Sequence, residues 1–190
     1  LFFMFVKPTV IDPLYNEFYP LKDKELESKI LALAEQAGIP ADHVFEVNMA
    51  EKTNAMNAYV TGIGSNSRIV LWDTTLNKLN DEEILFIMAH EMAHYVEKHI
   101  YLGIAGYLVL MLVGLWLTDK WMKRAIRNRG ELYGLENMSD IRSLPLFLLI
   151  TSILLFAASP VTNYVSRVQE TRADTYALNM TDNPEAAISS

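Results

Sequence analysis

The stretch Ile87–Trp116, IMAHEMAHYVEKHIYLGIAGYLVLMLVGLW, decides the fold, because ionisable side chains at its start run directly into an apolar segment. No Asp, Glu, Lys or Arg occurs from Ile100 to Thr118, and none occurs from Leu144 to Ser166. A helix of roughly 20 residues spans the ~30 Å hydrocarbon core of a bilayer. We therefore predict transmembrane helices at residues 100–118 and 144–160. The alternative is a pair of helices buried in a soluble core, which a domain this short rarely encloses on every side.

A third apolar segment, LFFMFV at Leu1–Val6, stands at the start of the sequence. It lacks the charged flank and the small-residue cleavage site of a signal peptide. We interpret residues 1–6 as the end of an upstream transmembrane helix, in which case the chain is part of a longer protein.

The composition indicates which binding partners and metal ligands are not expected. The chain is 51% hydrophobic with a net charge of −7, and Lys7–His99 holds eight basic and fifteen acidic residues. An acidic surface repels the phosphate backbone, so nucleic acid is not expected as a partner. The sequence contains no cysteine, which excludes disulfides and thiolate metal ligands.

Residues 7–99 predict an α+β part that is mainly helical with a small β-sheet. After a proline-rich extended connector, residues 22–38 form an amphipathic helix that ends at Gly38, and its apolar face consists of Leu26, Ile30, Leu33 and Ala34. Segments with β-branched and aromatic residues predict about three strands, at 43–50, 58–64 and 67–73.

The next helix carries the ionisable group of the opening stretch. Asn80 followed three residues later by Glu83 is a capping-box pattern. No breaker follows before Gly103, and glycine is tolerated in membrane helices. We therefore expect one continuous helix from about Asp81 into the apolar run.

Beyond the first apolar run we expect a polar loop at 119–143. Pro160 then closes or kinks the second transmembrane helix, and a further helix occupies residues 161–190.

His90 and His94 are four residues apart, so on a helix they lie about 40° apart in azimuth and one turn apart in height. Their imidazoles can then converge on one zinc ion at ~2.0–2.1 Å. Glu91 lies near the same face without stacking on either histidine, which suits a general base. The alternative is two surface histidines beside a solvated carboxylate, but the helix around them is mostly apolar, and ionisable groups there need partners or a function.

A catalytic zinc ion usually takes three protein ligands and a water, so a third ligand is needed. Without cysteine it must be His, Asp or Glu. His99 lies about 140° round a continuous helix from His94 and is badly placed. His43 lies in a loop before a strand.

The better candidate is the segment ETRAD, where Glu170 and Asp174 share one face of a helix. Glu170 would reach the metal, while Asp174 would anchor a ligand histidine. The alternative is a solvated face on which Arg167 and Arg172 pair with these acids, and the spacing alone leaves both interpretations open.

These motifs resemble those of the integral-membrane zinc metalloproteases typified by the type I CAAX prenyl protease and by HtpX. The likeness is closest to the CAAX prenyl protease branch and covers nearly the whole chain. It rests on four segments in order, which are IDPLYNEFYPL at 11–21, NAYVTGIGSNSRIVLWDTTL at 57–76, HEMAH at 90–94 and SRVQETRAD at 166–174. Ala93 stands where that branch usually has Gly, and the short 119–143 segment indicates a bacterial-type member, for which prenylated substrates are not expected.

The resemblance implies a zincin-like metalloprotease domain fused to transmembrane helices, with one Zn²⁺ per chain. The roles it implies are metal ligation by His90, His94 and Glu170, general base catalysis by Glu91, support of the metal site by Asp174, substrate binding by Asn57, Ala58 and Tyr59, and a supporting role for Arg167.

We therefore predict a membrane-embedded zinc metalloendopeptidase that cleaves membrane-associated or membrane-proximal proteins through a zinc-activated water, with Glu91 as the general base. One alternative is a catalytically silent zinc-binding membrane scaffold, against which Glu91 argues because a structural site does not need it. Another is a transporter component that uses intramembrane ionisable residues, which the zinc-protease spacing disfavours.

Two indications of orientation conflict. The 119–143 segment is basic, and the positive-inside rule would place it in the cytoplasm with the catalytic face outside. The family resemblance implies a multi-pass protein of the bacterial cell membrane with a cytoplasmic catalytic face, and we follow the resemblance.

Overall fold

The computed structural model describes residues 17–61, 67–135 and 137–189. The predicted upstream helix at residues 1–6 lies outside them. The chain forms two compact units, which are described separately: unit 1 is Leu1–Ile100 with Gln169–Ser190, and unit 2 is Tyr101–Val168. The elements in chain order are β1 (Phe18–Pro20), α3 (Lys24–Gln36), β2 (Val44–Val47), β3 (Ala58–Thr61), β4 (Arg68–Trp72), α4 (Asp73–Lys78), α5 (Asp81–Val96), α6 (His99–Tyr133), a 3₁₀ turn (Ile141–Ser143), α7 (Leu144–Thr181) and α8 (Pro184–Ser189).

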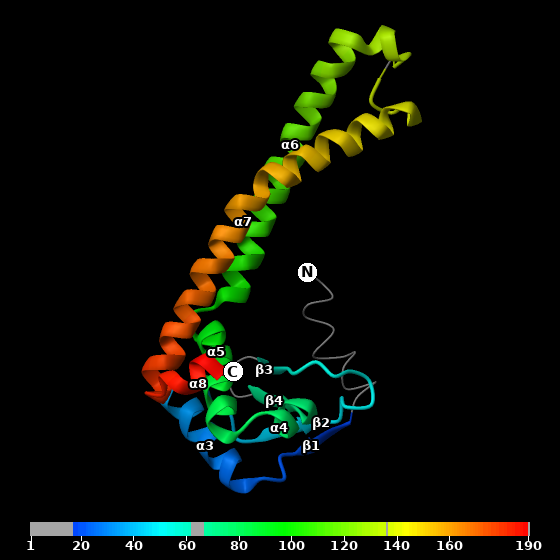
Figure 1. Cartoon of the computed structure of the whole chain (residues 1–190). Coiled ribbons are helices and arrows are strands. Elements are labelled where there is room, and N and C mark those ends of the chain that lie inside the picture. The colour runs from blue at the N-terminus through cyan, green and yellow to red at the C-terminus, as the bar shows by residue number, and fades with distance from the viewer. Residues whose placement is uncertain (1–16, 62–66, 136, 190) are drawn as a thin grey trace. The chain divides into compact units, whose positions relative to one another are not determined.

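Unit 1 contains a mixed sheet in the order β1-β2-β4-β3 (Figure 1). Strands β2 and β4 are parallel, whereas β1 pairs with β2 and β3 pairs with β4 in antiparallel fashion. The three predicted strands are confirmed as β2, β3 and β4. The fourth, β1, falls at the end of the proline-rich connector, where Pro20 hides the strand pattern. Within the described sheet β3 is an edge strand, paired only with β4.

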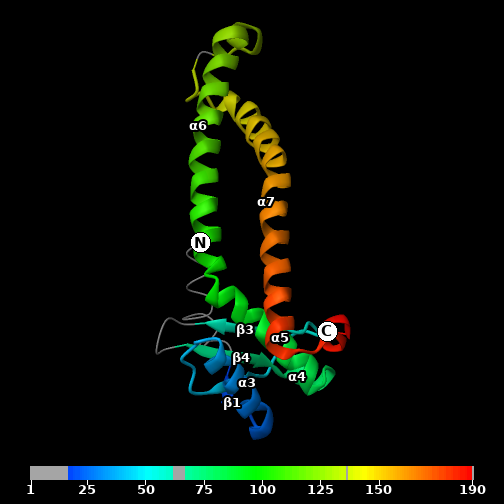
Figure 2. The same cartoon turned by 90° about the vertical axis from the view of Figure 1, so that its left-hand side faces the viewer.

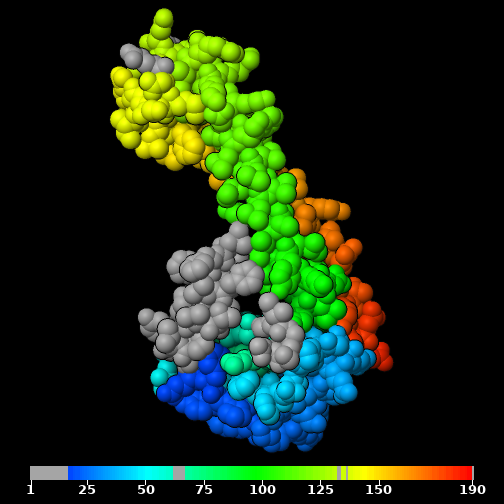
Figure 3. Space-filling model, turned by 180° about the vertical axis from the view of Figure 1, so that it is seen from behind, coloured from blue at the N-terminus to red at the C-terminus, as the bar shows by residue number. Residues whose placement is uncertain are grey.

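Helices α3 and α5 share one core cluster with the sheet. Its buried members include Leu26 and Ile30 from α3, Ile84, Met88 and Met92 from α5, and Val44, Ile69 and Leu71 from the strands. Ile69 and Leu71 of β4 both belong to this cluster, because alternate residues of a strand point to the same face of the sheet. The space-filling view shows the chain from β1 to β3, blue to cyan, gathered in one closely packed mass (Figure 3).

The predicted amphipathic helix is confirmed as α3. Its Leu26, Ile30 and Ala34 are buried, and Asp23 accepts hydrogen bonds from the backbone N–H groups of Glu25 and Leu26 at its start. Gly38 adopts φ 71°, a left-handed conformation that ends the helix without a side-chain clash.

Helix α5 begins as predicted, because Asn80 and Glu83 form the reciprocal hydrogen bonds of a capping box. The predicted continuity into the apolar run is wrong. α5 ends at Val96, and Lys98 adopts φ 56° before α6 begins at His99. The N–H groups of Glu97 and Lys98 donate to Ala93 O and Tyr95 O, so a left-handed cap closes the helix without glycine.

Unit 2 holds most of the two long helices, α6 and α7 (Figure 2). His99–Glu131 and Ile141–Thr181 are both long and apolar enough to cross a membrane. Their apolar windows are almost entirely unburied, unlike the core helix of a soluble protein. The two predicted membrane helices are therefore present as helices of sufficient length and hydropathy.

The predicted polar loop at 119–143 is wrong over most of its length, because α6 continues to Tyr133. Lysine and arginine are good helix formers, and Lys123 pairs with Asp119 one turn earlier at 2.8 Å. The helix ends where Gly134 adopts φ 65°. Near this end Met122, Leu135 and Ile150 are buried against their neighbours.

Pro160 does not end the second apolar helix, so of the two effects predicted for this residue, closing the helix is wrong. α7 runs through Pro160 from Leu144 to Thr181. A proline removes one backbone hydrogen bond, which a membrane helix tolerates. A separate helix, α8, begins at Pro184, and Asn183 accepts a hydrogen bond from Ala186 N at its start.

Candidate metal centre

Helix α5 fixes the two histidines of the HEMAH motif. Its residues Met88, Ala89, Met92 and Ala93 are fully buried and anchor the helix in unit 1. His90 and His94 alternate with these residues and are half-buried. Their rings lie 4.8 Å apart between centroids, so both imidazoles are presented on the same side of α5.

The C-terminal part of α7, which belongs to unit 1, brings the predicted third ligand to this face. His90 Nε2 lies 3.3 Å from Glu170 Oε2, His94 Nε2 lies 3.7 Å from the same oxygen, and the two Nε2 atoms are 3.1 Å apart. Two imidazole nitrogens and one carboxylate oxygen are a donor set that zinc prefers. Donors ~2.0–2.2 Å from a tetrahedral ion are about 3.3–3.5 Å apart, so the triangle fits zinc.

Small side chains explain how α7 comes this close to α5. Ala89 of α5 and Ala177 of α7 are buried in one cluster with Phe86 and Ala186, so α5, α7 and α8 meet there. Ala173, between Glu170 and Asp174 in sequence, is also fully buried. Alanines at these positions let the backbones of α5 and the end of α7 approach each other (Figures 1 and 2). This approach brings the carboxylates of Glu170 and Asp174 to the histidines.

Asp174 contacts His90 at the ring nitrogen Nδ1, opposite the nitrogen that faces Glu170. Its Oδ1 lies 2.9 Å from His90 Nδ1, on the side of the ring away from Glu170. A carboxylate in this position holds the proton on Nδ1 and leaves the Nε2 lone pair for a metal. This is the contact expected of Asp174 from the sequence, and its effect on metal binding stays a prediction.

Glu91 is half-buried beside the two ligand candidates. Burial raises the pKa of its carboxyl group above the ordinary value of 4.5, and the nearby Glu170 raises it further, whereas His90 acts in the opposite direction. A carboxylate with a raised pKa holds a proton more firmly, as a general base requires.

Sequence reasoning placed His99 too far from His94, because it assumed an unbroken helix. The left-handed Lys98 interrupts the helix between His94 and His99. His99 is buried, and its Nδ1 lies 2.8 Å from His94 Nδ1. No glycine or proline marks this turn in the sequence, so the contact could not be predicted from it.

His94 therefore has an imidazole on each side, that of His90 and that of His99. Burial lowers the pKa of His94 below its ordinary value of 6.5, and the neighbouring His90 lowers it further. Its imidazole is therefore held neutral, which is the form that binds a metal.

The predicted substrate-binding residues Asn57, Ala58 and Tyr59 lie at the start of β3. Thr75 ties the backbone of Asn57, since its Oγ1 accepts from Asn57 N and donates to Asn57 O, both at 2.9 Å. The Asn57 side chain is exposed, whereas Ala58 is buried in the core. Ala58 can therefore act on a substrate only through its backbone.

The two arginines near the third-ligand segment differ in position. Arg172 Nη1 lies 3.7 Å from Glu97 Oε2, so this arginine reaches the α5–α6 junction. Arg167 belongs to unit 2, and its supporting role stays a prediction.

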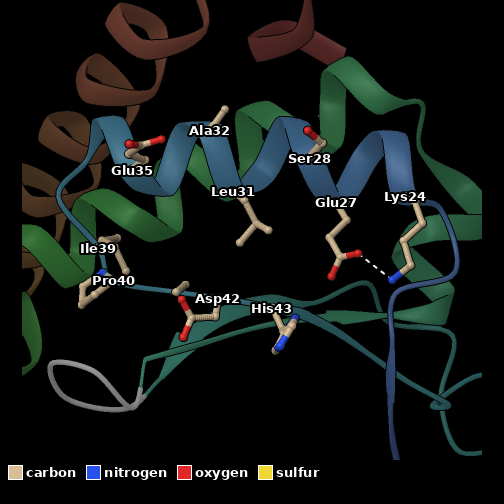
Figure 4. A pocket seen from close by; sticks show the side chains of 11 residues that line it. Lys24, Glu27, Ser28, Leu31, Ala32, Glu35, Ile39, Pro40, Asp42 and His43 are labelled. Carbon is tan, nitrogen blue, oxygen red and sulfur yellow. Dashed lines mark hydrogen bonds and ion pairs between the residues drawn. The ribbon is translucent and has the colours of Figure 1, made fainter.

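His43 lies apart from this site. It is exposed and lines an open hollow of about 720 Å³ between α3 and the segment before β2 (Figure 4). In that hollow Glu27 accepts hydrogen bonds from Lys24 Nζ at 2.6 Å and from Val44 N at 3.3 Å, which links α3 to β2. These contacts are structural.

Comparison with known proteins agrees with this geometry. The sequence model of Peptidase family M48 matches residues 20–190. The "Uncharacterized metalloprotease YhfN" of Bacillus subtilis (strain 168) is 62% identical over 188 residues, which cover 99% of this chain and 44% of that protein. The CAAX prenyl protease 1 of Saccharomyces cerevisiae is 32% identical over 192 residues, covering 93% of this chain and 42% of that protein.

Among solved structures, the crystal structure of S. mikatae Ste24p has a similar fold, with a TM-score of 0.67 and 26% identity, over 98% of this chain and 47% of that one. The chain thus spans less than half the length of these relatives. The M48 metalloproteases are zinc-dependent, and the cluster of His90, His94 and Glu170 is compatible with a zinc site. The family match over most of the chain, together with this donor set, identifies the chain as a member of peptidase family M48.

Proposed function

We propose that this chain is the catalytic part of a membrane-embedded zinc metalloendopeptidase with a zincin-like site. The observation that carries the proposal is the triangle of His90 Nε2, His94 Nε2 and Glu170 Oε2, whose sides of 3.1, 3.3 and 3.7 Å suit one zinc ion. His90, His94 and Glu170 would hold that ion, one per chain. The 62% identical relative from Bacillus subtilis is named as a metalloprotease, which supports the same activity.

A bound zinc ion supplies a Lewis acid that polarises the scissile carbonyl and lowers the pKa of water towards ~7. Glu91 accepts a proton from the attacking water as the new C–O bond forms. It then delivers this proton to the amide nitrogen as the C–N bond breaks. One water is consumed, and the products are a carboxylate and an amine.

The substrate is held, in this proposal, by the edge strand β3. An extended peptide adds to such an edge through backbone hydrogen bonds, with Asn57, Ala58 and Tyr59 along it. Thr75 fixes the backbone of Asn57, so the start of the edge is rigid. Arg167 would support the site from the preceding turn of α7.

The substrates we propose are membrane-associated or membrane-proximal polypeptides. The candidate membrane helix α6 follows the segment of His90 and His94 in the sequence, and the candidate membrane helix α7 itself carries Glu170. Several relatives are named CAAX prenyl protease 1, and that activity acts on proteins. We further propose a multi-pass protein with a cytoplasmic catalytic face, and an enzyme similar to CAAX prenyl protease 1 and HtpX. Reporter fusions in the Gly134–Asp140 segment test the orientation, since a cytoplasmic reporter there would contradict it.

The activity is tested on the purified membrane protein in detergent with casein as substrate. Cleavage should stop when a chelator removes the metal and return with added zinc. Glu91→Gln should abolish cleavage while zinc remains bound, and Glu35→Gln, an exposed change on α3, is the matched control. A wild-type protein that binds zinc and cleaves nothing would instead support a silent zinc-binding scaffold.

A further inference from the structure

We propose that His99 is a positioning residue for the ligand His94, and that Glu97 fixes the tautomer of His99. This inference rests on the proposed function, because it takes His94 Nε2 as a metal ligand. Four side chains would then form one ordered chain from the metal site to the α5–α6 junction.

The contacts form a continuous path. His94 Nδ1 lies 2.8 Å from His99 Nδ1, and the two rings are nearly edge to face with centroids 4.9 Å apart. His99 Nε2 lies 3.0 Å from Glu97 Oε2. Arg172 Nη1 is 3.7 Å from the same carboxylate oxygen. All of these residues belong to unit 1.

The chemistry of imidazole assigns each proton in this path. Two facing nitrogens at 2.8 Å need one N–H donor and one lone pair between them. If Nε2 of His94 gives its lone pair to the metal, Nδ1 of His94 carries the proton and donates it to His99. His99 then accepts at Nδ1, carries its own proton at Nε2, and donates that proton to Glu97.

The hydrogen-bonded path passes through a buried side chain. The side chain of His99 is 5% exposed, so water does not replace its hydrogen bonds. A buried imidazole without partners would be costly, and here both of its nitrogens have one.

The two ligand histidines are therefore held differently. His90 is backed directly by the carboxylate of Asp174 at 2.9 Å, whereas His94 is backed by a second imidazole and only then by a carboxylate. Groups that hold a ligand histidine in this way typically change metal affinity by about 10–100-fold. We expect His99 to contribute an effect of that size.

The test compares two substitutions at one position in the purified membrane protein. His99→Leu removes the acceptor and keeps much of the side-chain volume. His99→Asn keeps an acceptor oxygen close to the position of Nδ1. Zinc affinity is measured by competition with a chelator, and the visible spectrum of the Co²⁺-substituted protein reports the geometry of the ligands.

His99→Leu should raise the zinc Kd by about 10–100-fold and alter the Co²⁺ spectrum, and His99→Asn should recover most of both. Glu97→Gln, which removes the charge and keeps the side-chain length, should fall between wild type and His99→Leu. Melting temperatures of the metal-free variants separate loss of folding from loss of ligand orientation.

Two results would overturn the proposal. One is a His99→Leu variant with the wild-type Kd and spectrum. The other is a His99→Asn variant as weak as His99→Leu, which would assign His99 a packing role alone. A wild-type protein that binds zinc and cleaves no peptide would contradict the proposed function while these measurements still decide the role of His99.

Discussion

Glu91 carries a carboxyl group that is half-buried on a helix whose neighbours Met92 and Ala93 are enclosed in the core. In the metal-free protein its pKa is raised above 4.5 because burial disfavours the charged form. The folded state then binds this proton more tightly than the unfolded state. Its contribution to stability is complete below pH 4.5 and is lost as the pH rises through the pKa of the folded state.

Glu91→Gln should therefore stabilise the metal-free protein at neutral pH, because it removes a buried charge, and the difference should vanish below about pH 4.5. Melting temperatures of both proteins in a chelator, measured across the pH range, test this sign. Identical curves at every pH would mean that Glu91 is effectively solvated. The same substitution should lower kcat by about 10²–10⁴-fold, the usual contribution of a general base.

Glu170 and Asp174 share a helix face, but their atoms meet the histidines differently. Glu170 Oε2 faces both Nε2 atoms, whereas Asp174 Oδ1 faces only His90 Nδ1. Glu170→Ala should remove a direct ligand and lower zinc occupancy strongly, while Asp174→Ala should weaken binding by about 10–100-fold. Zinc content after dialysis against a graded chelator series measures both. Wild-type occupancy in Glu170→Ala would place the third ligand elsewhere.

At the scale of elements, the junction of α5 and α6 depends on one residue in an unusual conformation. Lys98 at φ 56° is left-handed, which costs a residue with a side chain about 1–2 kcal/mol. A β-branched residue tolerates this region least. Lys98→Val should therefore lower the free energy of unfolding and weaken zinc binding, because His99 loses its approach to His94.

Lys98→Gly is the matched control, because glycine adopts positive φ without strain. Lys98→Gly should have a free energy of unfolding at least as high as that of wild type, and a zinc Kd no higher than that of wild type. Chemical denaturation and chelator competition on the two variants provide the comparison. If Lys98→Val behaves like Lys98→Gly, the turn at Lys98 does not set the position of His99.

The junction also shows where prediction from sequence ends. Two helix boundaries could be predicted because each depends only on local residues. They are the capping box of Asn80 and Glu83 and the end of α3 at Gly38. The end of α5 was not readable, since no glycine or proline marks it and a lysine adopts the left-handed cap. Helix continuation through residues 119–133 was missed because charge was taken for a loop signal.

At the scale of the whole molecule, the candidate ligand cluster was predictable and the contacts that support it were not. The spacing of His90, His94, Glu170 and Asp174 places each pair on one helix face, whatever the helix packs against. What brings the two helices together is the alanine cluster of Ala89, Ala177 and Ala186 with Phe86, and alanines in a sequence do not show which partner they will meet. The His94–His99 contact depends on that packing and on the turn together.

The turn at Lys98 also interrupts the chain between the candidate ligands of α5 and the candidate membrane helix α6. His90 and His94 lie before the turn, so tilting of α6 in response to membrane thickness is not transmitted to them through an unbroken helix. Glu170, in contrast, lies in α7, which is one helix from Leu144 to Thr181. A change of tilt under hydrophobic mismatch would move Glu170 relative to the two histidines.

We therefore expect the zinc Kd to depend on the acyl-chain length of the surrounding lipid. In vesicles of phosphatidylcholines with graded chain length, the zinc Kd should pass through a minimum at one thickness. An inserted alanine after Ser159 should shift that minimum, because it lengthens α7 by ~1.5 Å and rotates Glu170 by ~100°. A zinc Kd that does not vary with chain length would show that the packing of Ala173 and Ala177 holds α7 against such tilting.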